Sequence, residues 1–219
     1  MIKACIFDLD GTILYTLDSM AKPGNQVLKE LGLKAHPVEN YRYYCGDGPD
    51  VLVKRILEDA GDKELACYDR ALPLYREYFS RDMMYGVKEM PQVRETLTDL
   101  KKRGLKLAVC SNKPQEATKA IIETFYPGIF DVVIGQSQEV PRKPAPDEAW
   151  MAAEGMGVLP EECVYIGDSG TDMLTGKAAG MYTVGVLWGY RDLDELEENG
   201  ADTAVFAPED LIRLPVLDG

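Results

Sequence analysis

The sequence predicts an α/β fold, in which a doubly wound, Rossmann-like parallel sheet is covered by helices and carries an inserted helical domain. Two observations indicate the sheet: short apolar segments rich in β-branched residues alternate with amphipathic patterns, and several of these segments end in Gly, Ser or Asp. A third indicates the insertion, since roughly 70 residues after the first strand show helical patterns and no comparable strand.

The elements of the sheet domain follow from local signals. Helix starts favour proline and helix ends favour glycine, and three of the expected helices begin with proline while three end on glycine. The tail, residues 201–214, fits one more short strand and a closing helix. The expected strands are 2–7, 105–110, 131–135, 163–167 and 182–186, and the expected helices are 91–104, 114–125, 146–155 and 171–180.

The insertion defines the domain organisation. Its expected helices are 19–32, 48–61 and 63–83, and segments 14–16 and 84–86 are expected to pair as the hinge. We therefore expect residues 1–15 and 85–219 to form the α/β core domain and residues 16–84 to form a helical cap domain.

Composition excludes several classes of function. The chain has 219 residues, with 37 acidic residues against 24 basic ones and a net charge of −13, which disfavours binding of a nucleic acid polymer. No apolar stretch approaches 18 residues and the N-terminus lacks a signal-peptide pattern, so we expect a cytoplasmic protein without a membrane partner. Its five cysteines show no C-x-x-C spacing and are expected to be reduced. A monomer and a homodimer both remain open.

Polar residues follow four of the expected strands. Each alone is typical of a turn, a helix cap or a solvated loop. The carboxyl ends of parallel strands meet at one edge of a sheet, however, and there several acids, a hydroxyl and a lysine together indicate an active site. These residues are Asp8 and Asp10 after the first strand, Ser111 and Asn112 after the second, Lys143 beyond the third, and Asp168 and Asp172 after the fourth.

Four segments in this order resemble the motifs of the haloacid dehalogenase superfamily: DLDGT (8–12), SN (111–112), KP (143–144) and GDSGTD (167–172). The insertion resembles the small, C1-type helical cap, and residues 179–191 and 200–211 resemble the closing region of phosphoglycolate phosphatase-like members. The resemblance implies a Mg²⁺-dependent phosphatase that hydrolyses a small phosphorylated metabolite, a phosphomonoester, through an aspartyl-phosphate intermediate.

The resemblance also implies roles for individual residues. Asp8 would be the nucleophile and Asp10 the general acid and then the base. Ser111, the backbone amide of Asn112 and Lys143 would bind the phosphoryl oxygens. Mg²⁺ would be held by Asp8, the backbone carbonyl of Asp10 and Asp168. Asp172 and Thr12 would orient these groups through hydrogen bonds or ion pairs.

Substrate selection is expected to come from the cap, because the core residues address only phosphate. The CGDG turn at 45–48 is the candidate substrate loop, with Arg42, Gly46 and Lys54 as candidate substrate contacts, although packing and solvation explain the two charged residues equally well. His36, the one histidine, is expected at the surface. Tyr15 and Gln92 depart from the family pattern and leave the closure of the cap undetermined.

Other functions remain open. A pyrophosphatase or a 5′-nucleotidase of the same superfamily fits the same residues. A β-phosphoglucomutase-like phosphomutase is disfavoured because Met20 stands where such relatives carry a cap-hinge histidine. A non-catalytic phospho-accepting or binding α/β module is the alternative of a different class, and it is disfavoured because GQSQEV, after the third strand, lacks the aspartate that a receiver needs.

Overall fold

The computed structural model describes residues 1–217, which divide into two compact units. One unit contains Met1–Leu14 and the chain from Glu89 onward, and the other is Tyr15–Lys88. Within the described part of the chain, no helix combines the length and the apolar character that crossing a membrane requires.

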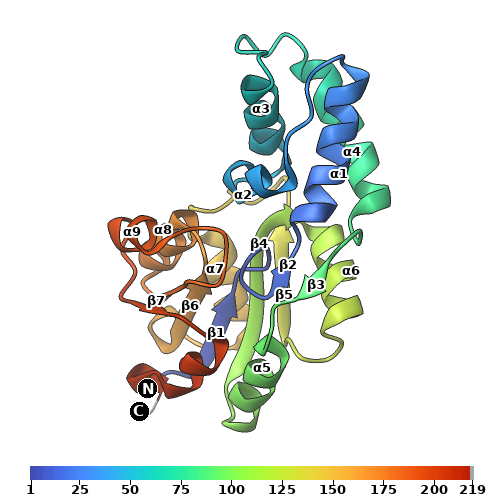
Figure 1. Cartoon of the computed structure of the whole chain (residues 1–219). Coiled ribbons are helices and arrows are strands. Elements are labelled where there is room, and N and C mark those ends of the chain that lie inside the picture. Colours follow the sequence, from blue (N-terminus) through green and yellow to red (C-terminus); the bar gives the residue numbers. More distant parts are fainter. Residues whose placement is uncertain (218–219) are drawn as a thin grey trace. The chain divides into compact units, whose positions relative to one another are not determined.

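A parallel sheet organises the first unit, as the sequence predicts (Figure 1). Among the described residues it has six strands in the order β5-β4-β1-β6-β7-β8, and all neighbouring strands in this order are parallel. In the centre, Ala4 of β1 lies opposite Lys106 of β4 and Cys163 of β6. The strands are β1 (Ala4–Phe7), β4 (Lys106–Pro114), β5 (Val132–Gln136), β6 (Cys163–Gly167), β7 (Tyr182–Val186) and β8 (Thr203–Val205).

Both faces of the central strands are buried, which explains why they are apolar throughout rather than alternating. On one face, small residues of α7 such as Ala149 and Ala152 let the helix pack closely against Ile6 and Tyr165. On β1 the next residue, Phe7, meets Phe130 edge to face, with ring centroids 6.3 Å apart. The helices of this unit are α5 (Val93–Lys102), α6 (Gln115–Phe125), α7 (Asp147–Met156), α8 (Gly170–Ala179) and α9 (Leu193–Glu198).

Two features near the C-terminus differ from expectation. The short helix α9, which Asp192 caps by accepting a hydrogen bond from the Glu195 amide at 3.1 Å, was not predicted. The expected closing helix is a 3₁₀ helix, η3 (Pro208–Arg213), followed by η4 (Pro215–Leu217). Another 3₁₀ turn, η2 (Pro160–Glu162), precedes β6.

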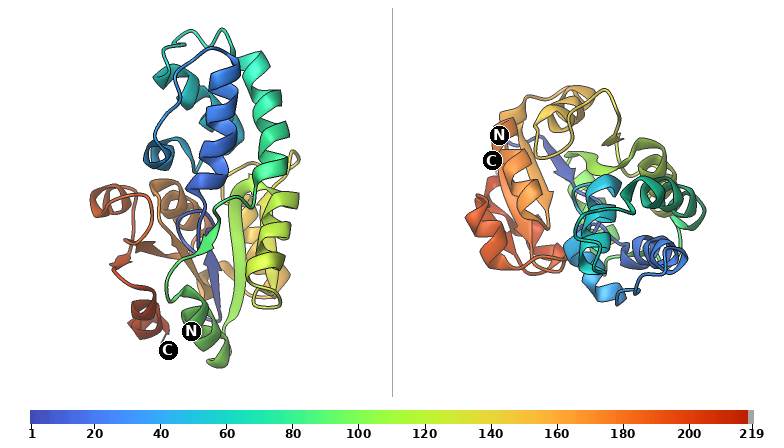
Figure 2. Two further views of the ribbon diagram at one scale, coloured as in Figure 1. Left: turned by 45° about the vertical axis from the view of Figure 1, so that its right-hand side comes forward. Right: turned by 90° about the horizontal axis from the view of Figure 1, so that it is seen from above.

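The second unit is helical, and α1 and α4 lie side by side in it (Figure 2). Polar contacts at 2.5 Å join these two helices, from Lys22 to Asp82 and from Tyr78 to Glu30. Gly24 is required in α1, because a Cβ there would lie 2.4 Å from the Tyr41 hydroxyl. The elements are α1 (Leu17–Glu30), η1 (Val38–Asn40), α2 (Tyr41–Tyr44), α3 (Pro49–Asp59) and α4 (Tyr68–Asp82).

Helix α4 begins five residues later than the expected start at 63. The Asp62 carboxylate accepts hydrogen bonds from the amides of Ala66 and Cys67, at 2.9 and 2.8 Å. Leu65 adopts a left-handed conformation with φ of 55°. Side-chain bonding to the backbone therefore stabilises a turn where the pattern alone predicts helix.

The chain returns from the helical unit to the sheet unit a few residues after the expected second hinge at 84–86. Strand β2 (Leu14–Tyr15) pairs with β3 (Lys88–Glu89) rather than with residues 84–86. Tyr85 donates its amide to the Asp82 carbonyl at 2.8 Å and Gly86 has φ of 66°, so this segment forms the turn that closes α4.

Candidate active site

One buried ammonium group joins carboxylates from two different elements at the strand ends. Lys143 Nζ lies 2.7 Å from Oδ1 of Asp8, directly after β1, and 2.7 Å from Oδ1 of Asp172, on α8. It also donates to the Cys110 carbonyl of β4 at 3.2 Å. The structure thus brings together three segments that the sequence assigns to one site.

Asp168, after β6, lies beside this group. Its Oδ1 accepts a hydrogen bond from the Thr12 hydroxyl at 3.1 Å, and its Oδ2 accepts one from the Tyr190 amide at 2.7 Å. Carboxylate oxygens of Asp8, Asp168 and Asp172 all lie within 4.8 Å of one another.

Two glycines make room for Asp168. A Cβ on Gly11, which has φ of 88°, would lie 2.3 Å from Asp168 Oδ2. A Cβ on Gly189 would lie 2.2 Å from the Cβ of Asp168. Both distances are far below van der Waals contact, so the turn after β1 and the loop after β7 need glycine at these positions.

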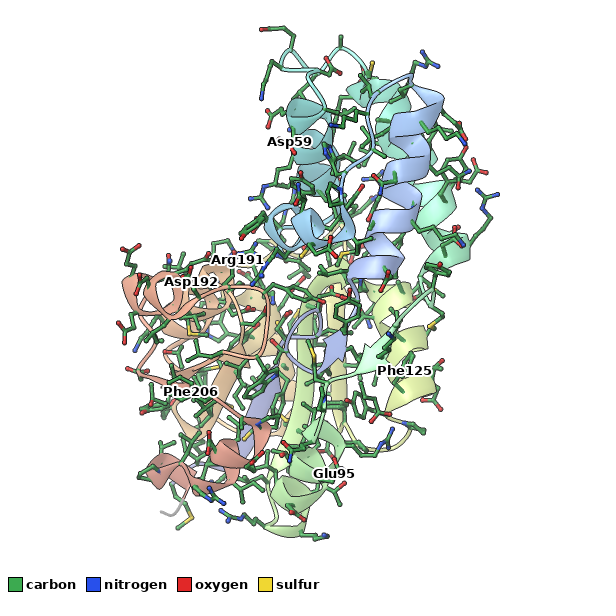
Figure 3. All side chains as sticks on the ribbon, viewed as in Figure 1. Asp59, Glu95, Phe125, Arg191, Asp192 and Phe206 are labelled. Carbon is green, nitrogen blue, oxygen red and sulfur yellow. The ribbon has the colours of Figure 1, made fainter. Side chains whose placement is uncertain are left out.

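Burial dominates the electrostatics of the cluster. It raises the pKa of Asp8 well above its usual range, against the opposing effect of Lys143. Burial and the neighbouring Asp172 raise the pKa of Asp168 to about 7, although the Tyr190 amide and the charge of Arg191, labelled in Figure 3, act in the other direction. Burial alone would lower the pKa of Lys143, but Asp172 and Asp8 raise it well above its usual value, so Lys143 stays charged.

The donor set fits Mg²⁺. Three buried carboxylates lie close together while one ammonium group contacts two of them, and a divalent cation would offset their excess negative charge. The side chains that meet there offer oxygen atoms, which Mg²⁺ prefers. Asp172 is the least available of the three, because Lys143 holds its Oδ1 while the Ser169 amide and hydroxyl hold its Oδ2 at 3.1 and 2.6 Å. Asp8 and Asp168 therefore fit the metal better, and Asp172 fits the support of Lys143.

Asn112 connects β4 to the loop that carries Lys143. Its side-chain amide donates to the Lys143 carbonyl at 3.2 Å, and its Oδ1 accepts from the Lys143 amide at 3.0 Å. Sequence reasoning considered only the backbone amide of Asn112. The side chain forms a reciprocal pair of bonds between residues 31 positions apart, which no local pattern reveals.

Lys113 is a buried charge that sequence reasoning did not single out. Its Nζ lies 3.1 Å from Oδ1 of Asp10. Lys113 comes two residues after Ser111 and directly after Asn112, and both of these residues are predicted for the site. That spacing is a signal in the sequence that could have identified it.

Glu148, in the first turn of α7, was also missed. The residue is fully buried, and the thiol of Cys110 lies 3.9 Å from its Oε2. Burial raises the pKa of Glu148 to about 7, and the charge of Lys143 partly opposes this shift. A carboxyl group thus lies under the site without taking part in the cluster of aspartates.

The predicted cap residues lie in the helical unit. The Arg42 guanidinium lies 5.5 Å from the ring centroid of Tyr43, and Lys54 Nζ lies 5.2 Å from that of Tyr68. Gly46 is in a turn with φ of 109°. Their part in substrate binding stays a prediction.

A surface depression of about 550 Å³ in the same unit is formed by other residues, among them Asp59, which Figure 3 labels. His36, expected at the surface, has only 8% of its side chain exposed. Its Nε2 lies 2.9 Å from the Ile56 carbonyl and its ring packs against Tyr44, so the surface prediction was wrong.

Known proteins resemble this chain over most of its length. The family described as haloacid dehalogenase-like hydrolase matches residues 5–186. A phosphoglycolate phosphatase of Aquifex aeolicus is 32% identical over 214 residues, which are 97% of this chain and 96% of the relative. A phosphoglycolate phosphatase of Nitrosospira multiformis is 32% identical over 218 residues, with the same coverage of 97% and 96%.

Solved structures show the same fold. A protein from Lactobacillus delbrueckii subsp. bulgaricus, crystallised as a candidate phosphoglycolate phosphatase, has a TM-score of 0.89 at 32% identity over 95% of this chain and 96% of its own. CbbY from Rhodobacter sphaeroides, crystallised in complex with phosphate, has a TM-score of 0.77 at 26% identity, with complete coverage of both chains.

Proposed function

This chain belongs to the haloacid dehalogenase-like hydrolase family, and we propose that, as a phosphatase of that family, it hydrolyses a small phosphomonoester through a phosphorylated Asp8. The observation that carries the proposal is the contact of one charged lysine, Lys143, with Asp8 at 2.7 Å where β1 ends. A buried carboxylate beside a fixed cation has the character of a nucleophile held next to a site for an anionic phosphoryl group.

In the first step, the Asp8 carboxylate attacks phosphorus. Lys143 holds Oδ1, which leaves Oδ2 as the oxygen that we assign to the attack. As the new oxygen–phosphorus bond forms, the bond between phosphorus and the leaving oxygen breaks, and the electron pair stays on that oxygen. Asp10 gives it a proton, and the alcohol departs.

In the second step, Asp10 removes a proton from water, and the water oxygen attacks phosphorus. The bond to Asp8 breaks, its electron pair returns to the carboxylate, and inorganic phosphate leaves. Two displacements with a shared acid and base replace one difficult hydrolysis. Asp10 ends the cycle protonated, ready to serve as acid again.

Charge neutralisation is the task of the groups around these two acids. Ser111, the backbone amide of Asn112 and Lys143 would bind the oxygens of the transferring group. Mg²⁺, held by Asp8, the backbone carbonyl of Asp10 and Asp168, would supply charge stabilisation of the phosphoryl oxygens. Thr12 keeps Asp168 in position and Asp172 keeps Lys143 in position, at the distances given above.

The names of the relatives point to phosphoglycolate as the substrate. Relatives at 32% identity that cover almost the whole chain carry that activity in their names. The proposal therefore includes a short, acidic phosphate ester as the substrate. It also includes action in the cytoplasm as a monomer or a homodimer.

Release of inorganic phosphate from a panel of small esters tests the proposal. The panel contains phosphoglycolate, glycerol phosphate, nucleoside monophosphates and pyrophosphate, each with Mg²⁺. We expect turnover of the esters by the wild type and its loss in Asp8→Asn. Asp194→Asn, a change at an exposed aspartate of α9, is the matched control and should keep full activity.

Acid quenching during turnover provides a second readout. Mass spectrometry should find phosphate on the peptide that contains Asp8 in the wild type and not in Asp8→Asn. Retention of activity by Asp8→Asn, or no phosphate release from any compound by the folded wild type, would contradict the proposal. Pyrophosphate or a nucleotide as the best substrate would keep the chemistry and replace the phosphoglycolate assignment.

A further inference from the structure

A second buried lysine faces the other aspartate of the DLD segment. Lys113 Nζ lies 3.1 Å from Asp10 Oδ1, and only 3% of the Lys113 side chain is exposed, against 14% of the Asp10 side chain. Burying an ammonium group is costly unless a carboxylate compensates it, so the position of this lysine is tied to Asp10.

The end of β4 holds the backbone of Lys113 in place. The pairing of β4 with β5 shifts register between Ser111 and Pro114. Within this irregularity the Lys113 amide donates to the Ser111 hydroxyl oxygen at 3.3 Å, and the Lys113 carbonyl accepts from the Thr118 hydroxyl at 3.1 Å. Gly135 of β5 leaves room for this carbonyl, because a Cβ there would lie 2.8 Å from it. A fixed backbone places the long side chain reproducibly.

The two buried lysines divide the acids between them. Lys143 contacts Asp8 and Asp172, whereas Lys113 contacts Asp10. Asn112 directly precedes Lys113 on β4. Its side chain forms hydrogen bonds to the backbone of Lys143. The contacts of Lys143 and Lys113 thus involve different aspartates of the DLD segment.

We propose that Lys113 is a positioning residue for Asp10. Its ammonium group forms an ion pair with Oδ1, and we assign Oδ2 to the proton transfer to the leaving oxygen and later from water. The inference rests on the proposed function, because it assumes that Asp10 transfers protons. It deepens that function by predicting that Lys113 matters in the steps that use Asp10 and not in the attack by Asp8.

Substrates with different leaving groups distinguish an effect of Lys113 on proton transfer by Asp10 from an effect on the attack by Asp8. An alkyl phosphate such as glycerol phosphate needs a proton on its leaving oxygen, whereas p-nitrophenyl phosphate releases a stable anion and does not. In Lys113→Met, kcat/KM for the alkyl ester should fall at least about tenfold, since misplaced proton-transfer groups lose much of their catalytic effect. For p-nitrophenyl phosphate the fall should stay below about threefold. Equal losses on both substrates would indicate a general structural defect and overturn the inference.

A double-mutant cycle gives an independent readout. If Lys113 acts through Asp10, adding Lys113→Met to Asp10→Asn should change kcat/KM for the alkyl ester less than about twofold further. A further loss as large as that of Lys113→Met alone would overturn the inference. The double variant also removes both charges together, so it leaves no unpaired buried charge and serves if the single variant fails to fold. Lys119→Met, at an exposed lysine of α6, is the control for a lysine lost nearby and should match the wild type.

Failure of the inference and failure of the proposed function look different. If Asp8→Asn keeps its activity, the proposed function fails whatever Lys113 does. If activity depends on Asp8 while Lys113→Met affects both substrates alike, only the role of Lys113 is wrong.

Discussion

At the scale of single residues, buried charge decides what each group in the core can do. Glu148 is fully buried and its pKa is raised to about 7, mainly by burial. A carboxyl whose pKa is higher in the folded state binds its proton more tightly there than in the unfolded state. The free energy of unfolding therefore decreases as the pH rises from about 4.5, near the usual value of a glutamate, to about 7.

Glu148→Gln should remove this dependence, because glutamine does not ionise. Relative to the wild type, the variant should gain about 2–3 kcal/mol of unfolding free energy between pH 5 and pH 8, measured by urea unfolding at both values. Glu154→Gln, at an exposed glutamate of the same helix, should show no such gain. Equal differences from the wild type at the two pH values would show that Glu148 does not titrate in this range.

At the scale of elements, the turn after β1 depends on one glycine. Gly11 combines a left-handed φ of 88° with a close approach to Asp168. Gly104, after α5, has nearly the same φ of 86°, but a Cβ there would have no atom within 4 Å. Replacing either glycine would therefore strain the backbone to a similar degree, but only a side chain at position 11 would overlap with Asp168.

Gly11→Ala and Gly104→Ala should therefore lose similar stability from strain, about 1 kcal/mol each, with a further loss in Gly11→Ala from displacement of Asp168. Phosphatase activity should fall at least about a hundredfold in Gly11→Ala and stay close to the wild type in Gly104→Ala, because only the former displaces a group at the site. Measurement of kcat/KM and urea unfolding for both variants tests this. Similar activities in the two variants would show that the turn adapts to the extra carbon.

Local signals predicted most elements, and two of the exceptions are explained by side-chain bonding to the backbone or by a turn. The order of strands and helices in the sheet unit followed from apolar segments and helix-end residues. Helix α4 starts late because Asp62 bonds to the backbone ahead of it, and the hinge partner of Leu14–Tyr15 is Lys88–Glu89 because Gly86 belongs to a turn. Propensity alone does not weigh such contacts.

At the scale of the whole molecule, binding of a cation to the folded chain should raise its stability by mass action. At a Mg²⁺ concentration of about 100 times the Kd, the gain is roughly 2.7 kcal/mol, which corresponds to a rise in Tm of roughly 5–10 °C for a chain of this size. Thermal unfolding with and without EDTA measures the rise, which should be largely lost in Asp168→Asn, and EDTA should abolish phosphate release. Full activity after exhaustive chelation would exclude the metal from the proposal.

The sequence by itself determined the fold class and the succession of strands, because the alternation of strand segments with helical segments is a local property. It also determined where along the chain the candidate site residues lie, because strand ends are local as well. These residues are Asp8, Asp10, Ser111, Lys143 and Asp168. Only the tertiary structure decided which charges meet. Lys143 is 135 residues from Asp8, and Lys113 reaches Asp10 from the end of a strand whose register shifts at that point.

Side-chain partners at such separations depend on strand order and loop closure, and burial then sets the pKa values. None of these is encoded in a short stretch of residues. The pairing of two lysines with different aspartates, the clamp formed by Asn112 and the burial of Glu148 and His36 therefore appear only once the chain is folded.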